Sequence, residues 1–128
     1  MKPQPMIAVA DVAATSAWYQ KSLGLASGHG GDEYEQLLAG DEVVLQLHAW
    51  HADEHPHLGD PALAPRGNGV VLWFHAPDAA AAFERALAAG AEVLQALHVN
   101  PLAHHREFWL RDPEGYRVVV AGSYGDIG

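Results

Sequence analysis

One pattern occurs twice along the chain, and this internal repeat most constrains what the chain can fold into. Each copy opens with an apolar stretch that ends in aspartate, MIAVAD (6–11) in the first and VLWFHAPD (71–78) in the second. An Ala-rich segment follows in each copy, at 12–25 and 79–91, and its residue spacing predicts a helix. The chain therefore contains two strand–helix units of similar design.

Four residues mark the ends of these predicted helices. Asp11 and Asp78 stand where a carboxylate can accept hydrogen bonds from the free amides of a first helical turn. Gly24 and Gly90 stand where a left-handed residue is wanted to end a helix. We therefore expect each helix to begin directly after its aspartate and to end near its glycine.

Three candidate strands follow each predicted helix. Their expected ranges are 26–29, 33–39 and 42–49 in the first half, and 91–97, 105–111 and 115–121 in the second. The last two strands are joined at DPEG, where Pro113 presets a tight turn and Gly115 accepts a positive φ. The pattern is βαβββ in both halves, which predicts an α+β fold built from two βαβββ modules.

The segment between the halves, residues 50–68, has three prolines, two glycines and no periodicity. We therefore expect one domain over 1–128, with module 1 at 1–49, a linker at 50–68 and module 2 at 69–128. The linker is longer than most ordered connections, so it is also a candidate cover for a site.

Alternation along the strands predicts two different sheet faces. One face is uniformly apolar and suits a covering helix. The other face collects polar and aromatic side chains, namely Gln46, His48 and Trp50 within 43–50, and Trp73 and His75 within 70–75. Such a mixture suits the wall of a ligand pocket, where apolar area gives affinity and a few polar groups orient the ligand. A half-exposed sheet face at a dimer interface is the alternative.

Composition excludes several classes of partner. The formal net charge of −9 disfavours nucleic acid and anionic membrane surfaces, because both are bound through Lys and Arg. The chain has no cysteine, which excludes disulfides, thiolate metal sites and a cysteine nucleophile and suits a cytoplasmic protein. No stretch has the length of a signal or transmembrane segment.

Aromatic and acidic residues give further candidates for ligand contacts. Tryptophan offers a flat surface for a planar ligand or a cation, so Trp50, Trp73 and Trp109 are candidates, with core packing as the alternative. Negative charge near strand ends comes from Glu107 and from the acidic group Asp32, Glu33 and Glu35. These carboxylates could attract a cationic ligand, or they could form a solvated edge.

Both ends of the chain carry a family resemblance. PMIAVADVAATSAWYQKSLGL (5–25) resembles the opening module of the glyoxalase/bleomycin-resistance/dioxygenase family, also called the vicinal oxygen chelate superfamily. REFWLRDPEGYRVVV (106–120) resembles its closing hairpin and is most similar to the bleomycin-resistance branch. The resemblance implies a cupped mixed β-sheet with a helix on the outer face of each module, a cleft between the modules, and a homodimer.

The resemblance also implies a test for metal. Metal-dependent members of the family place one His or Glu ligand on each of four strands that face the cleft. Matching by distance from the aspartate caps and hairpin turns puts Gln4, Gln46, Val71 and Val119 at these positions. Valine cannot bind a metal and glutamine is a poor ligand for transition ions. We therefore expect no metal at the usual site, and none of the family's metal-requiring activities, such as lactoylglutathione formation or extradiol ring cleavage.

Nine histidines keep a different metal site in view. His48, His51, His55 and His57 fall in HAWHADEHPH, where we expect a polar loop that binds metal only adventitiously. His48 and His75 are expected to face the cleft, where they could ligate a displaced metal, hydrogen-bond a ligand, or stay buried and neutral. His104 and His105, at the mouth of the last hairpin, are expected to be exposed.

The sequence thus predicts metal-independent binding of a small molecule, planar or cationic, with no cofactor and no catalytic group, resembling the drug-sequestering bleomycin-resistance proteins. The predicted ligand contacts are Gln46, His48, Trp50, Trp73, His75, Glu107 and Trp109. One alternative is a lyase or dioxygenase of the same superfamily with a metal displaced to His48 and His75. Another is an accessory dimer that binds no ligand.

Overall fold

The computed structural model describes residues 1–50 and 57–127. The chain divides into two compact units, Met1–Ala64 and Pro65–Gly128, and the division falls inside the predicted linker. His51 and His55 of the predicted polar loop lie outside the described residues. Within the described part of the chain, no helix combines the length and the apolar character needed to cross a membrane.

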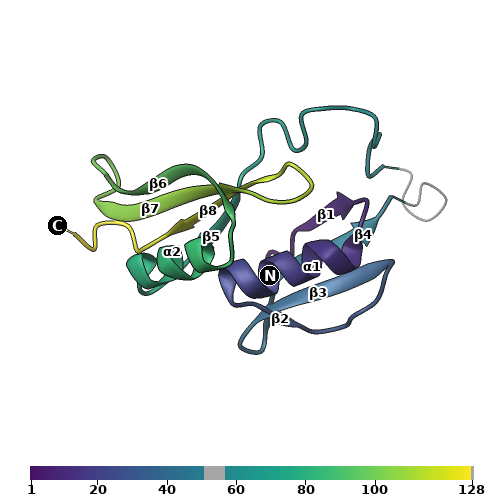
Figure 1. Cartoon of the computed structure of the whole chain (residues 1–128), viewed down its shortest axis with the longest axis horizontal. Helices are drawn as coiled ribbons and strands as arrows, with labels where there is room; N and C mark the ends of the chain where they lie inside the picture. The colour runs from purple at the N-terminus through teal and green to yellow at the C-terminus, as the bar shows by residue number, and fades with distance from the viewer. Residues whose placement is uncertain (51–56, 128) are drawn as a thin grey trace. The chain divides into compact units, whose positions relative to one another are not determined.

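The N-terminal unit is a four-stranded mixed sheet with one helix against it (Figure 1). Its elements are β1 (Met6–Val9), α1 (Val12–Leu23), β2 (Ala26–Ser27), β3 (Tyr34–Ala39) and β4 (Glu42–Ala49). The strand order is β1-β4-β3-β2, in which β1 runs parallel to β4 and the other neighbours are antiparallel.

The C-terminal unit repeats this topology, with its helix lying over the sheet (Figure 1). Its elements are β5 (Leu72–His75), α2 (Ala79–Ala88), β6 (Glu92–Asn100), β7 (His105–Arg111) and β8 (Arg117–Ala121). The order is β5-β8-β7-β6, again with one parallel pair, β5 and β8. The predicted α+β fold of two βαβββ modules is confirmed.

The predicted helix ends are confirmed by the cap geometry. The side chain of Asp11 accepts a hydrogen bond from the Ala14 amide, and Asp78 accepts one from the Ala81 amide. Gly24 has φ 72° at the end of α1. In the second copy α2 is capped by Ala89, and Gly90, with φ 76°, follows it directly.

Most of the predicted strand bounds differ from the observed ones by a few residues. β4 and β7 have the predicted ranges, whereas β2 ends at Ser27 because the chain then turns to surround a buried carboxylate. β6 runs on to Asn100 through two register shifts, which hide its period in the sequence. The predicted strand over 70–75 begins only at Leu72, and Val70, which precedes it, is exposed.

Each helix covers one face of its own sheet. In the N-terminal unit this face carries Ile7, Leu37, Leu45 and Leu47, all buried and paired in register. In the C-terminal unit it carries Phe108, Val120 and Phe74 in register, and the Phe108 ring lies 5.0 Å from that of Phe83 on α2. Because side chains alternate along a strand, the residues between these face away from the helix. We call that side of each sheet its non-helix face.

Glu35 lies on the helix face of the N-terminal sheet and is only 3% exposed. Its Oε2 accepts hydrogen bonds from the hydroxyls of Ser16 on α1, at 2.9 Å, and Ser27, at 2.7 Å. Its Oε1 accepts from the backbone amides of His29 and Gly30. The carboxylate therefore ties α1 to the loop after β2. The expectation that it forms part of a charged edge, with Asp32 and Glu33, is wrong for Glu35, although those two residues are exposed.

Burial by itself would raise the pKa of Glu35, because it disfavours the charged form. The hydrogen bonds from the Gly30 amide, the Ser27 and Ser16 hydroxyls and the His29 amide outweigh it and lower the pKa to about 2. The ionised form is thus the one that the fold stabilises. A shift of this size from 4.5 corresponds to about 3 kcal/mol of stability at neutral pH.

We therefore predict that Glu35→Gln lowers the free energy of unfolding by about 3 kcal/mol at neutral pH, because an amide NH₂ would face the donors. Wild type keeps this stabilisation above the unfolded pKa of Glu and loses it as the pH falls toward 2, so the difference between the two proteins shrinks in acid. Urea unfolding at a series of pH values measures it. Asp32→Asn, at an exposed carboxylate in the same loop, is the control, and equal losses in the two variants would contradict the prediction.

Candidate functional site

The non-helix face of the C-terminal sheet brings four of the predicted ligand contacts together. In the strand register Trp73 lies beside Val119, and Val119 lies beside Trp109. One pair further along, His75 lies beside Ala121, and Ala121 lies beside Glu107. Val119 and Ala121 on β8 are fully buried and lie between the β5 residues and the β7 residues of this group.

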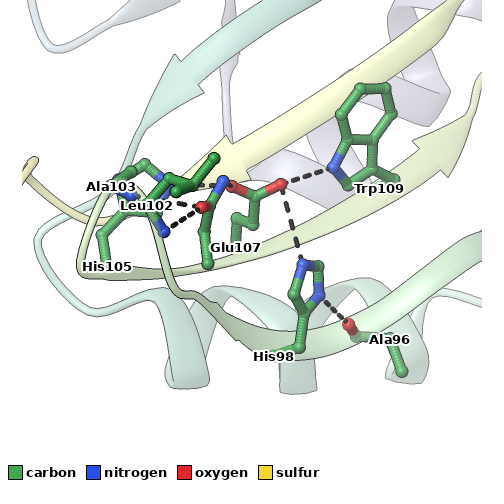
Figure 2. A network of polar contacts seen from close by, with 8 residues as sticks. Ala96, His98, Leu102, Ala103, His105, Glu107 and Trp109 are labelled. Carbon is green, nitrogen blue, oxygen red and sulfur yellow. Dashed lines mark hydrogen bonds and ion pairs between the residues drawn. The ribbon is translucent and has the colours of Figure 1, made fainter.

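Glu107 is the centre of a polar network on this face (Figure 2). Its Oε1 accepts hydrogen bonds from Asn100 Nδ2, at 2.9 Å, and His105 Nε2, at 2.8 Å. Its Oε2 accepts from the indole Nε1 of Trp109, at 2.7 Å, and lies 3.8 Å from His98 Nε2. His98 points toward the carboxylate from β6 and donates through Nδ1 to the carbonyl of Ala96. We call these five residues, Glu107, Asn100, His105, Trp109 and His98, the Glu107 cluster.

The Glu107 cluster holds a negative charge inside the protein. Glu107 is 4% exposed, and burial alone would raise its pKa. Hydrogen bonds from Trp109, Asn100 and His105, together with the charge of His105 when protonated, outweigh burial and keep the pKa below its usual range. The carboxylate therefore stays ionised, and it fixes the orientation of Trp109 and His105.

Sequence reasoning placed Glu107 near a strand end and missed most of its partners. Asn100, His98 and His105 were not among the predicted contacts, and the expectation that His105 is exposed is wrong, because it is 4% exposed. His104 is exposed, with φ 53° in the turn. A signal was present in the sequence: residues 105, 107 and 109 alternate within one strand and so share a face.

Trp73 and His75 stand at the β5 side of the same face. Trp73 is 52% exposed, and its ring centroid lies 5.8 Å from that of His105, with the planes tilted by 55°. His75 is exposed and its Nε2 lies 2.8 Å from the hydroxyl oxygen of Ser123. An accessible indole therefore lies next to a buried imidazole that is bonded to an ionised carboxylate.

The non-helix face of the N-terminal sheet is polar and internally bonded. Gln36 Nε2 donates to the Tyr34 hydroxyl, which donates to Gln46 Oε1 at 2.6 Å, and Gln46 Nε2 donates to the carbonyl of Gln4 at 2.8 Å. His48 is buried beside Tyr34, with 6.2 Å between ring centroids, and its Nδ1 donates to the Ala49 carbonyl. The structure thus places the predicted contacts Gln46 and His48 on one face of this unit.

Trp50 follows β4 and is half-buried, with its ring beside Gly59 of the linker. No helix or strand occurs in the described part of the linker, 57–68. Trp50 therefore stays a ligand contact that is predicted from the sequence.

The residues at the family's metal positions do not fit a metal. Met6 pairs with Gln46 and Trp73 pairs with Val119, so Gln46 and Val119 occupy corresponding places in the two sheets, as the repeat predicts. The amide of Gln46 is already bonded on both sides, and Val119 offers no donor atom. Val71 offers none either. In the described ranges, 1–50 and 57–127, no group of three or more His, Asp or Glu side chains is arranged to hold a metal ion.

Comparisons with solved structures show the same fold elsewhere. A protein of unknown function from Agrobacterium tumefaciens str. C58 is 23% identical, with 96% of this chain and 94% of that chain covered and a TM-score of 0.75. A glyoxalase/bleomycin resistance protein/dioxygenase family enzyme from Burkholderia phytofirmans PsJN is 22% identical, with 93% and 96% covered and a TM-score of 0.75. A glyoxalase/bleomycin resistance protein/dioxygenase from Nocardioides is 17% identical, with 98% and 87% covered and a TM-score of 0.75.

No curated protein matches the chain. The sequence profile of one family matches residues 3–120, which is nearly the whole length of the chain. Together with the paired βαβββ units, this match shows that the chain belongs to the Glyoxalase/Bleomycin resistance protein/Dioxygenase superfamily.

Proposed function

We propose that this chain binds a planar, cationic small molecule without a metal, on the non-helix face of its C-terminal sheet, and shields it as drug-sequestering proteins do. The observation that carries the proposal is that the ionised carboxylate of Glu107 is buried on the same face that presents the half-exposed Trp73. Sequestration needs no reacting group, only apolar walls and a few polar groups that orient the ligand.

Two attractive terms act on such a ligand. The indole of Trp73 can stack on a planar ring and attract a cation through its face. Glu107 adds a negative charge inside the protein, where water screens it less than on a surface. Its oxygens are occupied by the donors of the Glu107 cluster, so it acts on the ligand through its field and through the side chains that it orients.

The first test is selectivity for charge at constant shape. We expect the purified protein to bind 10-methylacridinium, a planar cation, at least about tenfold more tightly than neutral acridine or anionic acridine-9-carboxylate, measured by fluorescence polarisation. Trp73→Ala should weaken binding of the cation by about tenfold, because it removes the stacking surface. Tyr124→Ala, at an exposed aromatic residue in the same unit, is the control and should bind as wild type does. Equal affinity for the three dyes would rule the proposal out.

The second test removes the buried charge. Glu107→Gln should reduce the preference for the cation over neutral acridine by about tenfold while the protein remains folded by circular dichroism. Glu92→Gln is the matched control, since Glu92 lies on the neighbouring strand β6 in an exposed ion pair with Arg111, at 3.3 Å. If both variants shift the preference equally, the effect belongs to overall charge and Glu107 has no special part in binding.

The third test concerns metal, and it also covers the alternative of a displaced site. We expect affinity for 10-methylacridinium to be unchanged by a chelator or by added Zn²⁺, Mn²⁺ or Fe²⁺, because the family's ligand positions hold valine and a bonded glutamine. Metal content is measured in parallel on wild type and on a variant carrying both His48→Ala and His75→Ala. One equivalent of metal in wild type that is lost in this variant would favour a lyase or dioxygenase instead.

A further inference from the structure

His105 is a buried imidazole whose two ring nitrogens differ in their hydrogen bonding. Its Nε2 lies 2.8 Å from Glu107 Oε1, and because an ionised carboxylate can only accept, the hydrogen lies on Nε2. Its Nδ1 is buried and has no hydrogen-bond partner among the residues that the structure describes. A buried polar atom of this kind costs stability unless another molecule satisfies it.

The bond to Glu107 determines what Nδ1 can do. With the hydrogen fixed on Nε2, the neutral imidazole presents a lone pair at Nδ1 and is an acceptor there. Glu107 thus holds His105 in the tautomer whose second nitrogen accepts a hydrogen bond.

The surroundings of His105 provide a route to this acceptor. The ring lies against the indole of Trp73, which is 52% exposed and can therefore change rotamer. Ala121 lies beside Glu107, the hydrogen-bond partner of His105, and carries only a methyl group on this face.

We propose that His105 Nδ1 accepts a hydrogen bond from the ligand, so that the ligand class is a planar cation that carries an N–H group, such as a protonated nitrogen heterocycle or an aryl amidine, rather than a quaternary ammonium. This inference rests on the proposed function and narrows it. The N–H group of the ligand would donate to His105 while the ring of the ligand stacks on Trp73. The charged carboxylate of Glu107 is hydrogen-bonded to the other nitrogen of the same imidazole.

The experiment compares two planar cations that differ in their N–H donors. Protonated 9-aminoacridine offers N–H groups, whereas 10-methylacridinium keeps the plane and the charge and has none. We expect wild type to prefer 9-aminoacridine by about tenfold, the value of one hydrogen bond to a charged group. His105→Phe should abolish that preference, because a phenyl ring keeps an aromatic surface at this position and has no hydrogen-bond acceptor. The affinity of the same variant for 10-methylacridinium is the reference against which the preference is calculated.

Two readouts separate this inference from the function on which it rests. If both dyes bind and the ratio of their affinities is the same in wild type and His105→Phe, the inference fails and the proposed function stands. If neither dye binds, both fail. Nitrogen-15 spectra of the histidine rings give a measurement that needs no ligand: we expect His105 as the neutral Nε2–H tautomer, and a hydrogen on Nδ1 would overturn the inference.

Discussion

In the residues that the structure describes, each sheet has four strands and one helix packed against it, so one face of each sheet is covered by a helix of its own unit and the other is not. Period-two alternation then divides the side chains of every strand into a set that packs against the helix and a set that does not. In the C-terminal unit the first set is Phe108, Val120 and Phe74. The second set contains tryptophan, histidine and glutamate, which a core does not need. The candidate site follows from this division, because residues released from packing can be selected for other purposes.

Among the described residues, the buried glutamates Glu35 and Glu107 use the same hydrogen-bonding chemistry for different purposes. Glu35 lies on a helix face, and its donors are backbone amides and hydroxyls that fix a loop and a helix together. Glu107 lies on a non-helix face, and all its donors are side chains of the adjoining strands β6 and β7. Breaking the first set of bonds would unfold a loop. The second set is different, because its members are rings and amides whose remaining surfaces can meet a ligand.

The sequence predicted the parts of the fold that depend on local pattern. The aspartate caps, the ranges of β4 and β7 and the correspondence of Gln46 with Val119 follow from spacing and alternation, and the structure has them as predicted. The burial of Glu35 and His105 could not be predicted in this way. Glu35 is bonded to Ser16, nineteen residues away, and the ring of His105 lies 5.8 Å from that of Trp73, on a strand much earlier in the chain. Polar residues become buried through such distant partners, which periodicity does not reveal.

Comparison of corresponding positions shows how the two units have diverged. Tyr34 stands two residues before Gln36, the partner of Gln46, and Glu107 stands two residues before Trp109, the partner of Val119. In the first unit a continuous chain of hydrogen bonds runs from Gln36 through Tyr34 and Gln46 to the carbonyl of Gln4.

In the second unit the corresponding position is a carboxylate, which cannot donate and must therefore draw donors toward itself. Drawing the Nε2–H of His105 leaves the opposite nitrogen of that ring unsatisfied. In the N-terminal series the Tyr34 hydroxyl and the Gln46 amide have hydrogen-bond partners. In the C-terminal network Nδ1 of His105 has none among the described residues. Of the two faces, the C-terminal one therefore has the stronger energetic reason to take up a partner molecule.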